Sequence, residues 1–254
     1  MPMRILAIAN QKGGVGKTTT AMNLSACIAL SGRPCLLIDI DPQGNATSGL
    51  GHQRPQSGGA NDLLFAPDRA SSVVRETDIP GLHIVPASRQ LPAAERELSH
   101  LPDAPVRLRR AIESLKSAYN YIFIDCPPSL GLLPTNALAA AHGVIIPIQC
   151  EYYAMEGLAQ MLEYLSHARD QYNPPLAVDG ILFTMYERGH PYADEVAAEV
   201  RYHCNPNVYE CAIPRDTLLS EAPSHGKPII DYAPCSVGAW SYVELTKEIL
   251  SHET

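Results

Sequence analysis

The stretch NQKGGVGKTTTAMNLS, from Asn10 to Ser25, carries the most specific pattern in this chain. An apolar run from Arg4 to Asn10 leads into it, and a helical pattern from Thr18 to Leu30 follows its glycines. A strand, a glycine-rich loop and a helix in this order typically bind a phosphate group, because loop N–H groups and the helix N-terminus both point at the anion. The stretch therefore predicts a phosphate-binding loop.

The residues of this loop divide into those that shape the backbone and those that carry charge. Gly13, Gly14 and Gly16 allow a tight turn whose N–H groups face inward. Lys17 is placed to reach the β- and γ-phosphates of a nucleotide, and the Thr18 hydroxyl is placed to ligate Mg²⁺. An ordinary tight turn is the competing interpretation of the glycines. The predicted nucleotide contacts in this region are Lys12, Gly13, Gly14, Val15, Gly16, Lys17, Thr18 and Thr19.

The rest of the chain alternates short apolar runs with longer helical stretches, which is typical of β-α units that build a parallel sheet. With 254 residues, of which 46% are hydrophobic, the chain can bury one large core. We predict one α/β domain over residues 1–254, with a mostly parallel twisted β-sheet and helices on both faces. The expected strands are Arg4–Asn10, Pro34–Ile40, Leu82–Ala87, Tyr121–Cys126, Gly143–Gln149, Val178–Met185 and Asn207–Ile213. The expected helices are Thr18–Leu30, Pro105–Ala118, Met155–Gln171, Tyr192–His203 and Val237–Leu250, and Gly51–Asn61 is expected to be a loop.

Charge and hydropathy restrict the location of the chain. The formal net charge is -8 and the isoelectric point is about 5.6, which argues against a protein whose whole surface binds nucleic acid through positive charge. No apolar run approaches the ~20 residues of a membrane span, and the first apolar run is too short for a signal peptide. We therefore expect a cytoplasmic protein that does not enter the membrane.

Acidic residues end two of the expected strands. Asp125 ends one apolar run, and Asp39 and Asp41 end another and point to the same face. Ligands of parallel sheets bind at the carboxyl ends of the strands, so we expect Asp125 to hold Mg²⁺ directly or through water. Asp41, which is followed by the rigid Pro42, is expected to orient the attacking water and to join Thr18 and Asp125 at the metal. Asp39 is expected to support the metal or the phosphate loop from behind. The alternative role of Asp125 is to cap the end of its strand.

The base of the nucleotide is expected to rest against later strand ends. Pro214 offers a rigid apolar surface, and the planar cation of Arg215 can stack on a purine. Met185 follows an expected strand and completes the predicted base contacts. A surface salt bridge is an equally good interpretation of Arg215.

The KGGxGKT pattern resembles the deviant phosphate loop of the ParA/MinD family of ATPases. In this chain, Gln11 stands where the standard phosphate-loop motif has its first glycine. Later blocks resemble the family in the same order and cover most of the chain. They are IDIDPQGNATSGLG, YIFIDCPPSLG, NALAAAHGVIIPIQCEYYAMEGL, ILFTMYE and IPRDTLLSEAPSHGKPI. The small Soj-like ParA proteins are the most similar, because the first strand begins almost at Met1. The resemblance implies a P-loop NTPase fold with ATP and Mg²⁺ as ligands.

The resemblance also implies a mechanism and partners. Lys12 would cross the interface of an ATP-dependent sandwich homodimer and touch the partner's nucleotide, with Lys17 and Asp41 as the other catalytic residues. Glu151 is a weaker expectation as the contact of the partner's Lys12, and a solvated surface position is the competing interpretation of both side chains. The ATPase would be weak alone and stimulated by a ParB-like partner, and it would drive chromosome or plasmid partitioning on the nucleoid.

Nonspecific DNA binding is implied by the same resemblance, but the sequence departs from the family there. Glu187-Arg188-Gly189-His190 and Asp216-Thr217-Leu218-Leu219 stand where relatives commonly carry arginines. From Ile181 onward, five Lys or Arg residues face eleven Asp or Glu residues, a poor balance for phosphate contacts. The remaining expected DNA contacts are Arg188, Arg201 and Lys227, for which scattered solvent charges are an even alternative.

Three other functions remain open on the sequence. One is an orphan relative that positions a protein cargo, such as a chemoreceptor or enzyme cluster. The sequence alone barely distinguishes this function from that of a partition ATPase. A MinD-like membrane cycler is disfavoured because the C-terminal stretch WSYVELTKEILSHET is acidic and lacks a basic amphipathic helix. An iron-sulfur reductase is disfavoured because no glycine-rich cysteine loops are present.

Overall fold

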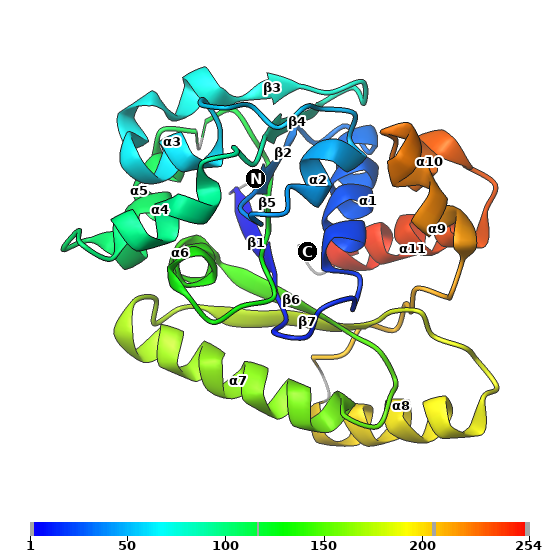
Figure 1. The fold of residues 1–254 in the computed structure, drawn as a ribbon. Helices are drawn as coiled ribbons and strands as arrows, with labels where there is room; N and C mark the ends of the chain where they lie inside the picture. The colour runs from blue at the N-terminus through cyan, green and yellow to red at the C-terminus, as the bar shows by residue number, and fades with distance from the viewer. Residues whose placement is uncertain (1–2, 116, 205–206, 252–254) are drawn as a thin grey trace.

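The computed structural model describes residues 3–115, 117–204 and 207–251, and these form a seven-stranded sheet between helical layers (Figure 1). The strand order is β3-β4-β2-β5-β1-β6-β7, and every neighbouring pair is parallel except β3 with β4. The strands are β1 (Arg4–Ile8), β2 (Cys35–Asp39), β3 (Arg75–Glu76), β4 (Leu82–Val85), β5 (Tyr121–Asp125), β6 (Gly143–Ile148) and β7 (Ala177–Phe183). The predicted fold class, a mostly parallel α/β sheet, is confirmed.

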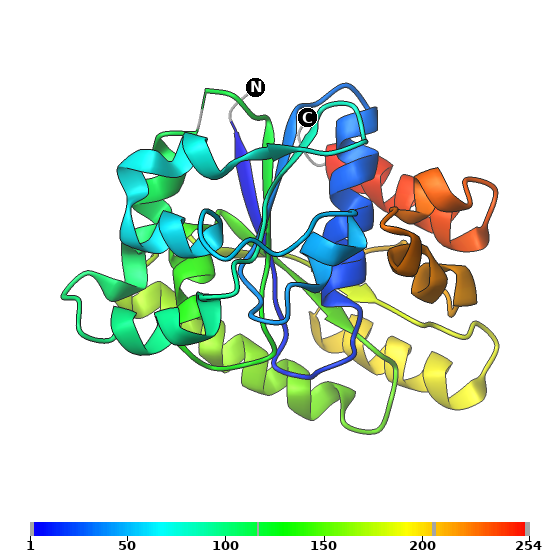
Figure 2. The same cartoon turned by 45° about the horizontal axis from the view of Figure 1, so that its top comes forward.

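The helices cover both faces of this sheet (Figure 2). They are α1 (Lys17–Leu30), α2 (Asn45–Gly49), α3 (Ala60–Phe65), α4 (Leu91–Leu98), α5 (Arg107–Glu113), α6 (Leu132–Ala140), α7 (Ala154–Gln171), α8 (Pro191–Cys204), α9 (Thr217–Glu221), α10 (Ile229–Tyr232) and α11 (Val237–Ser251). Short 3₁₀ turns η1 (Pro67–Val73), η2 (Ala104–Val106) and η3 (Ala222–His225) link them. In Figure 2, α1 and α11 lie on one side of the sheet and α3 to α6 on the other.

Successive strand residues point into two separate cores. In β1, Ile5 and Ala7 join the core beneath α3 to α8, whereas Leu6 and Ile8 join the core beneath α1 and α11. Because both faces of each central strand are covered, these strands read as continuous apolar runs. The helical layers leave the carboxyl ends of the strands free to carry a site.

The prediction of a strand over Asn207–Ile213 is wrong. Residues 207–213 run beside β7 but form no strand: Val208 makes an isolated parallel bridge with Ile181, and Ile213 N donates to the Phe183 carbonyl at 2.8 Å. Two backbone amides of this segment bond to a side chain and not to a strand. Glu210 N and Cys211 N donate to the carboxylate of Glu248 on α11, at 2.8 and 3.0 Å. A carboxylate 37 residues away cannot be anticipated from a local apolar pattern.

The ends of some helices also differ from expectation. The helix expected over Pro105–Ala118 is the shorter α5, which η2 precedes, and its expected span includes residue 116, which lies outside the described residues. The loop expected over Gly51–Asn61 ends where α3 begins at Ala60. The short β3 was not expected, because two residues carry too little pattern to detect. Among the described residues, no helix combines the length and apolar character that a bilayer crossing requires.

Gly180 on β7 provides a test of the core. A Cβ atom there would lie 2.3 Å from the ring of Tyr209, which is 1% exposed and donates its hydroxyl to Asp179 at 2.5 Å. We expect Gly180→Ala to lower the free energy of unfolding by about 1–3 kcal/mol, since the ring has to move inside a packed core. Gly157→Ala on α7 is the matched control, because no atom lies within 4 Å of its added Cβ. It should raise stability by about 0.4–1 kcal/mol. Urea denaturation of both variants measures the difference, and equal stabilities would contradict this account of the core.

Candidate nucleotide site

The loop between β1 and α1 is held in shape by two polar side chains. Asn10 is buried, and its Nδ2 donates to the Pro147 carbonyl at 2.7 Å while its Oδ1 accepts from Lys12 N at 2.9 Å. The Thr184 hydroxyl, at the end of β7, lies 2.9 Å from the Val15 carbonyl oxygen. Sequence analysis missed both residues, although each lies just beyond the carboxyl end of an apolar strand, Asn10 after β1 and Thr184 after β7, where a polar side chain is a signal in itself.

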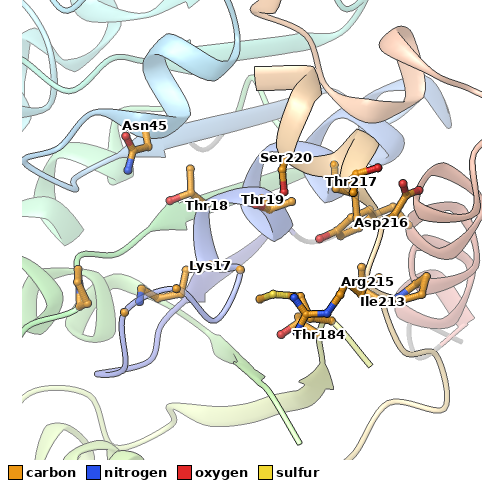
Figure 3. Close-up of a pocket in the computed structure, with 18 of the residues that line it drawn as sticks. Lys17, Thr18, Thr19, Asn45, Thr184, Ile213, Arg215, Asp216, Thr217 and Ser220 are labelled. Carbon is orange, nitrogen blue, oxygen red and sulfur yellow. The ribbon is translucent and has the colours of Figure 1, made fainter. Parts of the chain in front are cut away.

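The loop borders a pocket of about 510 Å³ at the carboxyl edge of the sheet (Figure 3). The predicted residues that line this pocket are Gly13, Gly14, Gly16, Lys17, Thr18, Thr19, Asp41, Met185, Pro214 and Arg215. Gly14 and Gly16 have φ angles of 77° and 82°, so glycine suits both turns. The structure thus brings together the phosphate loop, one strand-end aspartate and the expected base contacts.

Two predicted nucleotide contacts in the loop lie away from the pocket walls. The side chain of Val15 is buried, at 1% exposure, and its carbonyl is bound by Thr184. Lys12 points away, and its Nζ lies 2.6 Å from Glu151 Oε2 of the same chain. A contact between Lys12 and a partner's nucleotide stays a prediction, and it requires this ion pair to open.

Lys17 provides a buried positive charge at the base of the pocket. Its Nζ donates to the Lys12 carbonyl at 2.9 Å, which places the cation beneath the loop. Burial lowers the pKa of Lys17, and the nearby Asp125 and Asp41 act in the opposite direction. An anion bound in the loop would therefore meet a cation that little water reaches.

Two carboxylates stand side by side behind the loop, because Asp39 on β2 pairs in register with Asp125 on β5. Asp39 is fully buried and accepts from Asp41 N, Thr47 N and the Thr47 hydroxyl, at 3.1, 2.8 and 2.6 Å. Burial nevertheless raises the pKa of Asp39 to about 6, against the effect of these hydrogen bonds. Asp39 thus supports the loop that carries Asp41, and its expected support of the metal or of the phosphate loop stays a prediction.

Asp125 is equally buried but has no such support. Neither of its carboxylate oxygens has a hydrogen-bond partner among the described residues. Burial and the neighbouring Asp39 raise its pKa well above the usual range. The Thr18 hydroxyl and the Lys17 cation oppose this shift. An unpaired buried carboxylate beside a threonine hydroxyl is the oxygen donor set that suits Mg²⁺, so the residues present fit that ion.

Asp41 reaches the pocket from the loop after β2. It is 6% exposed, it lines the pocket with Lys17 and Thr18, and its Oδ1 accepts from Gln43 N at 2.8 Å. A carboxylate in this position can hold a water molecule beside a bound phosphate.

The far wall of the pocket comes from the ends of β7 and from the segment that leads into α9. Met185 has a φ angle of 50°, and its Sδ accepts from Gln149 Nε2 at 2.9 Å. Arg215 lines the pocket and donates from Nε to Glu187 Oε1 at 2.8 Å, so the salt bridge is present, and a contact with the base stays a prediction. Helix α9 was missed by sequence analysis. Its signal was the N-cap Asp216, whose carboxylate accepts from Leu218 N at 2.9 Å.

The three expected DNA contacts lie on different elements. Arg188 is exposed in the turn before α8, and Lys227, before α10, lies 2.9 Å from Asp231. Arg201 on α8 stacks over the ring of Phe183, with its guanidinium carbon 4.9 Å from the ring centroid. Within the part of the chain that the structure describes, no contact joins these three residues, so they do not form one basic cluster.

Comparisons with known proteins agree with this architecture. The family described as an AAA domain (AAA_31) matches residues 3–178. The sporulation initiation inhibitor protein Soj of Bacillus subtilis is 48% identical over 98% of this chain and 99% of its own length. The chromosome partitioning protein ParA of Caulobacter vibrioides is 44% identical over 99% of this chain and 96% of its own length.

A solved structure also matches. Cobyrinic acid a,c-diamide synthase from Mycobacterium smegmatis, with a bound ATP analog and magnesium, superposes with a TM-score of 0.86. It is 35% identical, and the match covers 99% of this chain and 96% of that one. The sequence identity, the full-length coverage and the phosphate loop on a parallel sheet lead to one conclusion: the chain belongs to the ParA/MinD family of P-loop ATPases and resembles its Soj-like ParA members.

Proposed function

We propose that this chain is a partitioning ATPase that binds ATP with Mg²⁺, dimerises face to face and hydrolyses ATP slowly until a partner stimulates it. One observation carries the proposal. The pocket places Lys17, Thr18 and Asp41 together, and Lys17 and Asp41 interact electrostatically with the buried carboxylate of Asp125, which has no hydrogen-bond partner among the described residues. The solved relative from Mycobacterium smegmatis, which holds an ATP analog and magnesium, supports the choice of ligands.

Each residue of the site has a distinct task in this proposal. The N–H groups of the loop and Lys17 neutralise phosphate charge, and Thr18, Asp125 and Asp41 would hold Mg²⁺, whose charge offsets the negative charge of the phosphates. Asp41 orients a water molecule for in-line attack on the terminal phosphate. Arg215 is the only arginine among the described residues of the pocket, and it is paired with Glu187. Without a free arginine at the phosphates, the basal rate should be low.

The proposed dimer assigns Lys12 to the partner's nucleotide. Two triphosphates that face each other repel, and a lysine inserted from each side turns that repulsion into attraction. The ion pair of Lys12 with Glu151 joins side chains that are 39% and 51% exposed. Pairs of this exposure contribute about 0.2–1 kcal/mol, so a nearby triphosphate can displace Glu151.

The relatives favour DNA as the cargo. Caulobacter ParA is named for chromosome partitioning, and its identity of 44% exceeds the 35% of the synthase over the same span of this chain. We propose nonspecific DNA binding by the ATP dimer, a ParB-like stimulating partner and a location on the nucleoid. The acidic last third and the scattered basic residues keep protein-cargo positioning as the second candidate.

A first test removes the Asp41 carboxylate. We expect Asp41→Ala to bind ATP normally, to lower ATP turnover at least tenfold, since the attacking water loses its positioning group, and so to trap an ATP dimer. Size-exclusion chromatography with ATP and steady-state turnover measure these effects. A variant that hydrolyses at the parent rate, or that stays monomeric with ATP, removes Asp41 from the mechanism.

A second test asks whether Lys12 acts across the dimer. Lys12→Gln and Lys17→Ala should each be inactive alone, and Lys17→Ala should no longer retain ATP at micromolar concentration. In a mixture, the heterodimer holds one complete site, with Lys17 from one chain and Lys12 from the other, so turnover should partly return. Crosslinking verifies that heterodimers form. Heterodimers that recover no hydrolysis would show that Lys12 does not act in trans.

A third test concerns DNA. The Asp41→Ala dimer with ATP should bind nonspecific duplex DNA, with an affinity that falls steeply as salt rises, because backbone phosphates are the contacts. Adding Arg188→Glu and Lys227→Glu to it should abolish DNA retention, and in the parent background this pair should leave ATP turnover intact. Lys247→Glu is the matched control, since Lys247 pairs with Glu244 within α11. Absence of retention by the Asp41→Ala dimer at low salt would favour a protein cargo.

A further inference from the structure

Arg54 lies across the loop that carries Asp41, although it belongs to the segment between α2 and α3. Its Nη1 donates to the Gln43 carbonyl at 3.1 Å, and its Nη2 donates to the Ser88 carbonyl at 3.1 Å. The guanidinium therefore joins the Asp41 loop to the segment that follows β4. Its Nε is buried and has no hydrogen-bond partner among the described residues, which shows how closely the side chain is enclosed.

Gly44 marks how tightly the arginine stem lies on the loop. A Cβ atom at Gly44 would lie 2.5 Å from Arg54 Cδ, and its φ angle of 67° is one that glycine adopts readily. The stem thus covers the backbone directly after Gln43.

Gln43 connects Arg54 to the carboxylate of Asp41. Its carbonyl accepts from Arg54, and its N–H donates to Asp41 Oδ1 at 2.8 Å. That N–H is the hydrogen-bond donor that orients the Asp41 carboxylate from within its own loop, so whatever fixes Gln43 also fixes the carboxylate.

The opposite end of the loop has its own anchor. Thr47 donates its hydroxyl to Asp39 at 2.6 Å, and the same oxygen accepts from Ala87 N at 2.8 Å. This anchor is buried, whereas the stretch from Pro42 to Asn45 is partly exposed and is held from outside by Arg54. Loss of Arg54 would free the middle of the loop and leave its end attached.

We infer that Arg54 is a positioning residue for hydrolysis, which acts on Asp41 through Gln43. The inference rests on the proposed role of Asp41. It predicts that the arginine matters for the rate of the chemical step and much less for nucleotide binding, because Arg54 is not among the residues that line the pocket.

The test compares Arg54→Ala with the matched control Arg109→Ala. Arg109, on α5, likewise donates from its guanidinium to a backbone carbonyl, that of Tyr172 at 3.0 Å, but it is not among the residues that line the pocket. We expect Arg54→Ala to lower basal kcat about tenfold, with KM for ATP changed less than about twofold, the size expected for one lost positioning hydrogen bond. Arg109→Ala should keep the parent values. Hydrogen exchange at the Gln43 amide should accelerate only in Arg54→Ala, and millimolar guanidinium should partly restore its kcat.

A double-variant cycle separates positioning from a general loss of structure. In the Asp41→Ala background, adding Arg54→Ala should lower turnover no further, because its effect passes through the missing carboxylate. An Arg54→Ala protein with the parent kcat, or an equal loss in both backgrounds, would overturn the inference and leave the proposed function standing. If Asp41→Ala itself keeps the parent rate, the proposed role of Asp41 fails, and the inference fails with it. Arg54→Lys is measured in the same way, so that a folding defect of the alanine variant does not decide the result. It keeps the charge but loses the planar fork that reaches both carbonyls.

Discussion

Two buried carboxylates, Asp39 and Asp125, stand in register at the ends of neighbouring strands, and the site is organised around their charge. A buried carboxylate is strongly destabilising unless hydrogen bonds or a cation offset the lost hydration. Asp39 obtains this compensation from Thr47 and from the backbone of Asp41, so it becomes a fixed support for the loop. The Asp125 carboxylate has no hydrogen-bond partner among the described residues, so it depends on positive charge, from Lys17 beside it and from the divalent cation that we propose it helps to bind.

The same balance of charge explains why the phosphate loop has two lysines with different surroundings. Lys17 is buried between the loop carbonyls and the carboxylates, so it serves its own pocket. Lys12 stays at the surface and pairs with Glu151 of its own chain. In the proposed dimer, this exposed pair is exchanged for a contact with the partner's triphosphate, and the weakness of the pair suits a contact that must form and break with each ATP cycle.

The loop after β2 is the second element on which the proposed chemistry depends. It carries Asp41 into the pocket, and it is tied to β2 through Asp39 and Thr47 and to the segment after β4 through Arg54. Such anchoring keeps the carboxylate in one orientation, which matters because misplacement of a positioning group slows phosphoryl transfer more than it weakens binding. The basic residues of the last third show no comparable organisation, since Arg201 is stacked on Phe183 and Lys227 is paired with Asp231.

The parallel α/β fold, the phosphate loop and part of the pocket lining could be predicted from the sequence alone. Apolar runs, glycines and strand-end aspartates report on local backbone geometry, and the carboxyl ends of parallel strands necessarily share one edge. The partners of these residues, in contrast, are known from the three-dimensional structure alone. Glu248 accepts hydrogen bonds from amides of the segment that was expected to be a strand. The Thr184 hydroxyl donates to the Val15 carbonyl, and Arg54 donates to the Gln43 carbonyl. These contacts join residues that are distant along the chain, and no local pattern encodes them, because they exist only after the sheet and its two helical layers have brought the segments together.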